Sequence, residues 1–284
     1  MFVIQIVTII FFAAVIIPSF AQTGAEACGE VVMLKTHGST TMRYALAQPK
    51  SEKAAGGRVA LILLPGGGGH VDLDDKGCPR ALVGNSLIRS IPLFNGLGFV
   101  TALVDAPSDH SDDDGLAGFR LAPDHAEDLG KAIADVRARI QGPVWVVGTS
   151  RGSISAVNAA MRLTGAAAPD GVVLTSALMV GSDSRVRPWL YQTVFEARLE
   201  DIKVPVLVVG HAADKCLRSP ARLMDRITAR TNGAREQVVT VTGGPGHAGA
   251  VSIEACVGNS PHGYADQQAD VAAGIARFVR GSTY

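Results

Sequence analysis

Apolar runs bounded by glycine and proline recur along the chain. Several are apolar at successive positions, which is typical of strands buried on both faces of a parallel sheet. The predicted strands occupy residues 58–66, 99–107, 143–150, 171–177, 204–211 and 236–243. Two extended segments nearer the front of the chain, VVMLKTH and TMRYALA, predict an antiparallel hairpin that turns at HGST.

Helical periodicity fills several of the intervals between these strands. Between residues 124 and 140, apolar side chains recur at helical spacing at Ala126, Leu129, Ile133, Val136 and Ile140. The segments SISAVNAAMRL, after Ser150, and DVAAGIARFV, near the end, show the same spacing. Strands that alternate with helices predict an α/β fold with a doubly wound, mainly parallel sheet and antiparallel strands at its front edge.

Residues 178–202 interrupt this alternation. Trp189, Leu190, Tyr191 and Phe195 stand there among charged side chains. A connection of this length inside a compact domain usually carries a function. We therefore expect a short cap over a pocket; the alternative is an ordinary helix pair that packs on the sheet.

The first 21 residues form an uncharged, almost continuously apolar segment. Its apolar run, from Phe2 to Ile17, is short for a membrane span, which needs about 20 residues. Small residues precede Gln22 at the positions that signal peptidase reads. We expect residues 1–21 to be a cleaved signal peptide and the mature chain to be periplasmic or secreted, with no stable membrane span. The alternative is an uncleaved anchor.

Residues 22–284 have the length of a single α/β domain. They carry all 26 basic and all 26 acidic side chains, so the mature chain is neutral. This balance of charge gives no sign of a nucleic-acid partner or of an anionic membrane partner.

Four cysteines in an exported chain favour disulfides over free thiols, and they can pair in three ways. The preferred pairing joins Cys28 to Cys78 and Cys216 to Cys256. The alternative for each cysteine is a small buried apolar residue. No C-x-x-C spacing occurs in the sequence, so it gives little support for a zinc site or a redox motif.

Candidate chemistry begins with the sequence G-x-S-x-G at Gly148–Gly152, in which the serine is Ser150. The motif directly follows the predicted strand PVWVV and opens a helical segment. A tight turn between a strand and a helix exposes a nucleophilic serine above the sheet. The flanking glycines fit because a Cβ would collide with the neighbouring strand and helix. The alternative is a serine that merely caps the helix.

The chain resembles the α/β-hydrolase superfamily over nearly all of its mature length. It is most similar to exported bacterial α/β hydrolases of unassigned substrate, through VDAPSDH, VGTSRGS, HAADKC and HGY. The resemblance implies the α/β-hydrolase fold and a serine, acid and histidine in that order along the chain. It does not identify a substrate.

Asp214 fits the position of the acid, because it follows the strand VPVLVVG by four residues. Asp183 and Asp201 lie in or beside the expected cap and are poorer candidates. The alternative for Asp214 is a solvated surface carboxylate. The acid would accept the Nδ1 proton of the base and thereby fix its tautomer.

Two histidines compete for the role of base. His262 lies in HGY, just before the last helical segment, whereas His247 lies in GGPGHAG, soon after the last strand. Proximity to the last helix and the HGY resemblance favour His262. The Cys216–Cys256 disulfide would also tie the acid loop to the segment that carries His262.

The glycine run Gly66–Gly69 ends the first long buried strand, where these hydrolases place an oxyanion donor. Gly67 and Gly68 are the candidates from this run, and Arg151, directly after the nucleophile, supplies the other backbone donor. Asp105 is expected to support the loop structurally. A phosphate-binding loop is disfavoured because no Gly-Lys-Ser/Thr sequence follows.

These residues predict a serine hydrolase that transfers an acyl group from a small-molecule ester or amide to water. Neither a metal nor an organic cofactor is required. A peptidase or a lactone hydrolase would use the same triad. The alternative from another class is an exported protein of this fold that binds a ligand without catalysis.

Overall fold

The computed structural model describes residues 27–49, 58–246 and 249–284. The expected signal peptide and the rival base His247 lie outside the described residues. Within the described ranges, no helix has the length and apolar character needed to cross a membrane.

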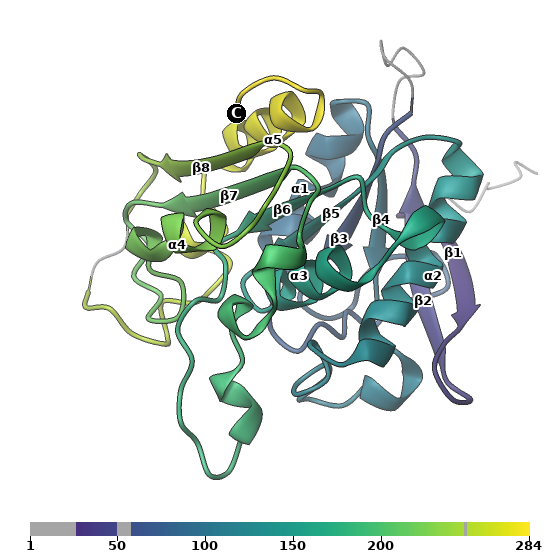
Figure 1. Cartoon of the computed structure of the whole chain (residues 1–284), viewed down its shortest axis with the longest axis horizontal. Coiled ribbons are helices and arrows are strands. Elements are labelled where there is room, and N and C mark those ends of the chain that lie inside the picture. The colour runs from purple at the N-terminus through teal and green to yellow at the C-terminus, as the bar shows by residue number, and fades with distance from the viewer. Residues whose placement is uncertain (1–26, 50–57, 247–248) are drawn as a thin grey trace, which may run out of the picture.

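The core of the fold is an eight-stranded sheet in the order β1-β2-β4-β3-β5-β6-β7-β8 (Figure 1). The hairpin strand β2 is antiparallel to both β1 and β4, and all the other neighbours are parallel. The hairpin and the six further strands predicted from the sequence are therefore confirmed. The strands are β1 (Glu30–Lys35), β2 (Thr41–Ala47), β3 (Ala60–Leu64), β4 (Val100–Val104), β5 (Val144–Thr149), β6 (Gly171–Thr175), β7 (Val206–His211) and β8 (Glu236–Val241).

Helices cover both faces of the sheet, so each face has its own apolar core. Along β3, Ile62 and Leu64 belong to the core beneath α2 and α3. The intervening Leu61 and Leu63 belong to the core beneath α1 and α5. This alternation explains why the strand is apolar at every position. The α-helices are α1 (Ser86–Gly96), α2 (Pro123–Ile140), α3 (Gly152–Arg162), α4 (Asp225–Thr228) and α5 (Gln268–Val279).

Helix α1 was not predicted from the sequence. Pro92 lies inside it, and a proline cannot donate a backbone hydrogen bond within a helix. The helix forms nevertheless, because the Asn85 side chain caps the Leu87 N–H and because Leu87 and Phe94 are buried in the core. Tertiary burial thus outweighs the local penalty of the proline.

The segment 178–202 does not form the helix pair that was the alternative to a cap. It forms the long green loop in Figure 1, with three short 3₁₀ turns at Pro188–Tyr191, Val194–Glu196 and Leu199–Asp201. Its later part packs into the core through Val194 and Leu199. Its earlier part borders a cavity, described below.

Both predicted disulfides are present. Cys28 is bonded to Cys78, and Cys216 is bonded to Cys256. The first joins the start of the described chain to the loop after β3. The second joins the loop after β7 to the segment before α5, and it therefore connects the two loops that carry Asp214 and His262.

Candidate active site

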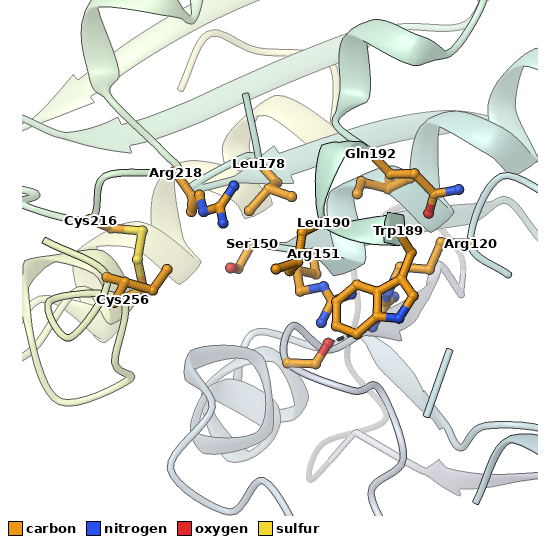
Figure 2. A pocket seen from close by; sticks show the side chains of 13 residues that line it. Arg120, Ser150, Arg151, Leu178, Trp189, Leu190, Gln192, Cys216, Arg218 and Cys256 are labelled. Carbon is orange, nitrogen blue, oxygen red and sulfur yellow. Dashed lines mark hydrogen bonds between the residues drawn. A yellow bond between two sulfur atoms is a disulfide. The ribbon is translucent and has the colours of Figure 1, made fainter. Parts of the chain in front are cut away.

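Ser150 sits at the sharp turn between β5 and α3, and it lines the cavity drawn in Figure 2. Its backbone has a φ of +51°, a left-handed conformation that non-glycine residues adopt mainly where the surrounding fold enforces it. A Cβ on Gly148 would collide with the Gly152 carbonyl, and one on Gly152 would collide with the Leu64 carbonyl. Both glycines are therefore required by the close approach of strand, turn and helix.

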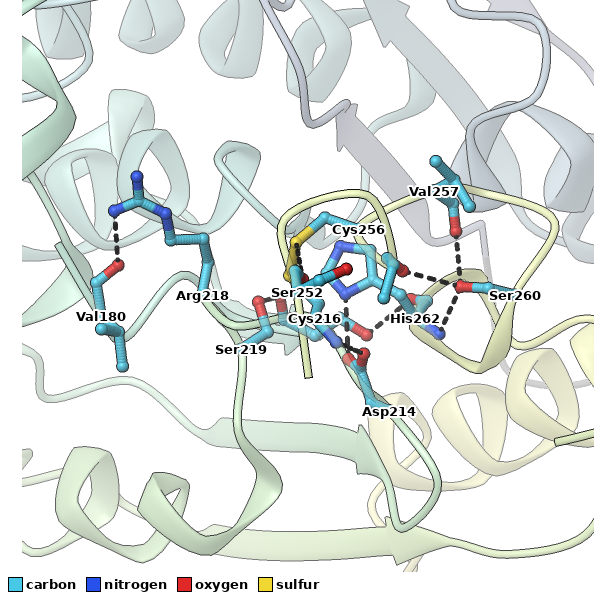
Figure 3. Close-up of a disulfide and its surroundings, with 12 residues drawn as sticks. Val180, Asp214, Cys216, Arg218, Ser219, Ser252, Cys256, Val257, Ser260 and His262 are labelled. Atoms are coloured by element: carbon cyan, nitrogen blue, oxygen red, sulfur yellow. Dashed lines mark hydrogen bonds and ion pairs between the residues drawn. A yellow bond between two sulfur atoms is a disulfide. The ribbon is translucent and has the colours of Figure 1, made fainter. Parts of the chain in front are cut away.

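His262 and Asp214 form a buried pair. The Nδ1 atom of His262 lies 2.9 Å from Oδ2 of Asp214, and the two side chains are 6% and 1% exposed. The other carboxylate oxygen, Oδ1, accepts the backbone N–H of Cys216 at 2.7 Å. Figure 3 shows this pair beside the Cys216–Cys256 disulfide. Asp214 is therefore not a solvated surface carboxylate, which was the alternative.

Further hydrogen bonds hold the His262 loop in place. The Ser260 hydroxyl accepts the His262 N–H at 3.1 Å and lies 2.9 Å from the Val257 carbonyl, to which it donates. The Ser176 hydroxyl donates to the His262 carbonyl at 2.7 Å. The Tyr264 hydroxyl accepts the Ser176 N–H and donates to the carbonyl of Val209, at 3.0 and 2.8 Å. The histidine is thus anchored to the ends of β6 and β7.

Ser150 and His262 line a common cavity of about 250 Å³. The Nε2 atom of His262 is buried and has no hydrogen-bond partner among the described residues. No hydrogen bond joins it to the Ser150 hydroxyl within that part of the chain. Such bonds often tighten only when substrate binds. Ser150 and His262 therefore border one cavity, and no described residue occupies the Nε2 atom of His262.

The glycine loop approaches Ser150 from the end of β3. A Cβ on Gly66 would lie 2.9 Å from the Ser150 Cβ, so the loop backbone is in contact with the nucleophile. Gly67, with a φ of +57°, lines both cavities that contain Ser150, whereas Gly68 lines neither. The Gly69 N–H is already bonded to the Gly66 carbonyl at 3.1 Å. Of the two candidates, Gly67 is therefore the one that borders the cavities at Ser150.

Two buried charged side chains hold this loop. Asp105 accepts the backbone N–H groups of Val71 and Leu73 at 2.8 and 3.0 Å, which agrees with the structural role expected for it. Arg120, which is 1% exposed, donates to the Gly67 carbonyl at 3.2 Å and to the Ser155 hydroxyl of α3 at 2.8 Å. Burial lowers the pKa of Arg120 to about 9, with a smaller contribution from Arg151.

A second cavity beside Ser150, of about 180 Å³, faces the 178–202 segment. Its walls combine apolar side chains with arginines, and Trp189, Leu190 and Gln192 close one side (Figure 2). The remaining lining side chains that bear on its chemistry are Arg120, Arg151, Arg218, Ile154, Leu178 and Ile253.

Among the described residues, two clusters bring metal-ligating residue types together, but in each of them one residue is already engaged in other bonds. In the cluster Asp214, Cys216 and His262, the cysteine sulfur is in a disulfide and offers no thiolate. In the cluster His37, Asp109 and His110, the Nε2 atom of His37 is hydrogen bonded to Asp109 at 3.0 Å. Its Nδ1 atom is bonded to Asp128 at 2.5 Å, so neither ring nitrogen is free.

No protein-family model matches the chain, and no curated protein matches its sequence. Solved structures do match its fold. Esterase 2 of Thermogutta terrifontis is 18% identical, with a TM-score of 0.59 over 92% of this chain and 97% of the esterase. An α/β serine hydrolase without a lid from Xanthomonas campestris is 16% identical, with a TM-score of 0.54 over 90% and 95%. The chain has the α/β-hydrolase fold.

A third match in this fold is the dienelactone hydrolase of Anabaena variabilis, at 12% identity and a TM-score of 0.55 over 90% of this chain and 100% of that one. In α/β hydrolases the triad follows the chain order serine, acid, histidine. In this chain the candidate residues Ser150, Asp214 and His262 follow β5, follow β7 and precede α5, respectively.

Several residues of the site could not be recognised from the sequence alone. Arg120 and Arg218 line a cavity with Ser150, although each lies far from it in the sequence. Ser176 and Ser260 orient His262 through hydrogen bonds from outside the motifs. Of the residues that anchor His262, only Tyr264 belongs to a motif recognised in the sequence, as the last residue of HGY.

Proposed function

We propose that this protein is a serine hydrolase that cleaves a carboxylic ester or amide through Ser150, His262 and Asp214. The observation that carries the proposal is the buried His262–Asp214 pair: His262 lines a cavity together with Ser150, and its Nε2 atom has no hydrogen-bond partner among the described residues. The strained backbone of Ser150 adds support, because such strain is concentrated at functional sites.

In the proposed reaction, Ser150 Oγ attacks the substrate carbonyl carbon while His262 Nε2 takes the hydroxyl proton. The imidazolium is stabilised by Asp214, whose carboxylate accepts the hydrogen bond from His262 Nδ1–H. That proton at Nε2 then passes to the leaving alcohol or amine. Water, activated by the same nitrogen, releases the acid from the acyl-enzyme and restores the Ser150 hydroxyl.

The negative oxygen of the tetrahedral intermediate would be stabilised by backbone N–H groups of Gly67 and Arg151. Neither N–H has an acceptor among the described residues, and both residues lie beside Ser150. Donors already in place cost no reorganisation when the charge develops. Arg120 supports this arrangement by holding the Gly67 carbonyl.

We also propose that residues 1–21 direct export and that part of the 178–202 segment acts as a cap. The two disulfides are consistent with an oxidising compartment. Trp189, Leu190 and Gln192 of the segment border a cavity at the nucleophile, as a cap would.

The test is a panel of short acyl esters, amides and lactones, assayed with the wild type and with Ser150→Ala. We expect the wild type to turn over at least one ester and the variant to lose about 10⁴-fold or more in kcat. The melting temperature of the variant should match that of the wild type, since one hydroxyl is removed beside a cavity. A folded wild type that hydrolyses no member of the panel would favour the non-catalytic binding protein.

A further inference from the structure

The cavity of about 180 Å³ beside Ser150 has an unusual balance of charge. Three arginines, Arg120, Arg151 and Arg218, are among the residues that line it, and none of its lining residues is acidic. Buried guanidinium groups are normally paired with carboxylates, because an unpaired charge away from water is costly. The charge of this cavity therefore points to an anion supplied by a ligand.

Arg151 is half-buried and lies over the Trp189 ring, with its guanidinium carbon 4.4 Å from the ring centroid. Burial lowers its pKa to about 10, and Asp114 opposes that shift. Asp114 does not form an ion pair with Arg151; it is about half exposed and lies 3.7 Å from Arg187. Arg151 thus keeps its positive charge at neutral pH with no carboxylate bound to it among the described residues.

Arg218 is 9% exposed. One of its terminal nitrogens donates to the Val180 carbonyl at 3.2 Å, and its other N–H groups have no acceptor in the described ranges. Burial lowers its pKa as well. Arg218 and Arg151 line the same cavity as Ser150 (Figure 2).

Arg120 differs from these two arginines. Its terminal nitrogens are committed to the Ser155 hydroxyl and to the carbonyls of Pro65 and Gly67. It therefore holds the glycine loop and adds positive charge, while Arg151 and Arg218 retain donors for a ligand.

The position of His262 decides which half of the substrate enters this cavity. The base must return its proton to the leaving group, so the leaving group has to lie on the His262 side of Ser150. His262 lines only the other cavity, of about 250 Å³. The acyl half of the substrate therefore occupies the arginine-lined cavity, where Ile154, Leu178 and Leu190 offer apolar contacts to its methylene groups.

We propose that the acyl half of the substrate ends in a carboxylate held by Arg151 and Arg218, so that the preferred substrates are monoesters of short dicarboxylic acids. This inference rests on the proposed serine hydrolase function. Hydrolysis consumes one water and yields the dicarboxylate, the alcohol and one proton. Guanidinium groups suit this role, because their planar N–H groups match the geometry of a carboxylate.

The experiment compares two esters of equal acyl length, monomethyl adipate and methyl hexanoate, by measuring methanol release at neutral pH. The quantity of interest is the ratio of kcat/KM for the charged ester to kcat/KM for the neutral one. Because both values come from the same protein sample, partial unfolding of a variant cancels in the ratio. The proteins are the wild type, Arg151→Gln, Arg218→Gln and, as a matched control, the exposed Arg222→Gln, which lies outside the cavity.

We expect the wild type to prefer monomethyl adipate and the ratio to fall by about 10- to 100-fold in at least one of the two cavity variants, because an interaction with a buried charge is lost. In Arg222→Gln the ratio should stay at the wild-type value. A wild type that prefers methyl hexanoate, or a ratio unmoved in both cavity variants, would overturn the inference while leaving the serine hydrolase intact. Absence of hydrolysis of both esters, together with a Ser150 that does not react with a fluorophosphonate, would overturn both proposals.

Discussion

The Nδ1 atom of His262 and the Oδ2 atom of Asp214 lie 2.9 Å apart although the residues are 48 positions apart in the sequence. Their loops are joined by the Cys216–Cys256 disulfide, which lies two residues after the aspartate and six before the histidine. The Nε2 atom of His262 has no hydrogen-bond partner among the described residues, and His262 lines a cavity with Ser150.

Replacing Asp214 with asparagine should lower kcat by about 10⁴-fold, because the amide favours the wrong imidazole tautomer. The matched control is Asp183→Asn, which changes an exposed carboxylate in the 178–202 segment and should retain wild-type kcat. Steady-state hydrolysis of a reactive ester would measure both. If Asp183→Asn were the inactive variant, the acid would have been misassigned.

Replacing His262 with alanine should remove most of kcat, whereas His247→Ala should keep kcat within about tenfold of the wild type. An inactive His247→Ala with a nearly normal His262→Ala would show that the GGPGH segment supplies the base.

The two disulfides should differ in their effect on catalysis. Replacing both Cys216 and Cys256 with serine should lower the free energy of unfolding by roughly 2–4 kcal/mol and also lower kcat, because this bridge ties the acid loop to the base loop. The Cys28 and Cys78 pair provides the control, since its double serine variant should lose stability but keep kcat. Chemical denaturation and ester hydrolysis measure the two effects. Equal loss of kcat in both variants would contradict the role given to Cys216–Cys256.

The stability of the β1–β2 turn should depend on pH through His37. Burial lowers its pKa, but hydrogen bonds to Asp128 and Asp109 outweigh burial, so the pKa lies above the ordinary 6.5. The folded state therefore binds this proton more tightly than the unfolded state. The stabilisation is fully present below pH 6.5 and is lost as pH rises through the raised pKa.

This dependence can be measured as the difference in melting temperature between the wild type and His37→Gln across that pH range. The difference should be largest on the acid side and should shrink toward alkaline pH. A difference that stays constant with pH would show that the protonated His37 is not stabilised by Asp128 and Asp109.

Sequence reasoning recovered those parts of the molecule that local patterns determine. The buried strands were visible because both faces of β3 meet apolar cores, and Ser150 was visible because its turn demands glycine at positions 148 and 152. Helix α1 was missed because Pro92 breaks the local signal. Arg218 was missed because its position beside Ser150 depends on how distant loops pack, which no short pattern records.

The choice among the loop glycines was also beyond the sequence. All four are equally permissive as residues, and only the structure shows that Gly69 has already used its N–H and that Gly67 lines the Ser150 cavities. Similarly, the HGY motif favoured His262 as the base. The hydrogen bond between His262 and Asp214, however, is visible only in the structure.

The central claim is that Ser150 is a nucleophile activated by His262, and covalent labelling tests it most directly. The wild type would be treated with a fluorophosphonate, digested and mapped by mass spectrometry. Our account predicts a single adduct on the peptide that contains Ser150, with labelling absent in Ser150→Ala and strongly slowed in His262→Ala. An adduct on a different residue, or a folded wild type that does not react, would contradict it.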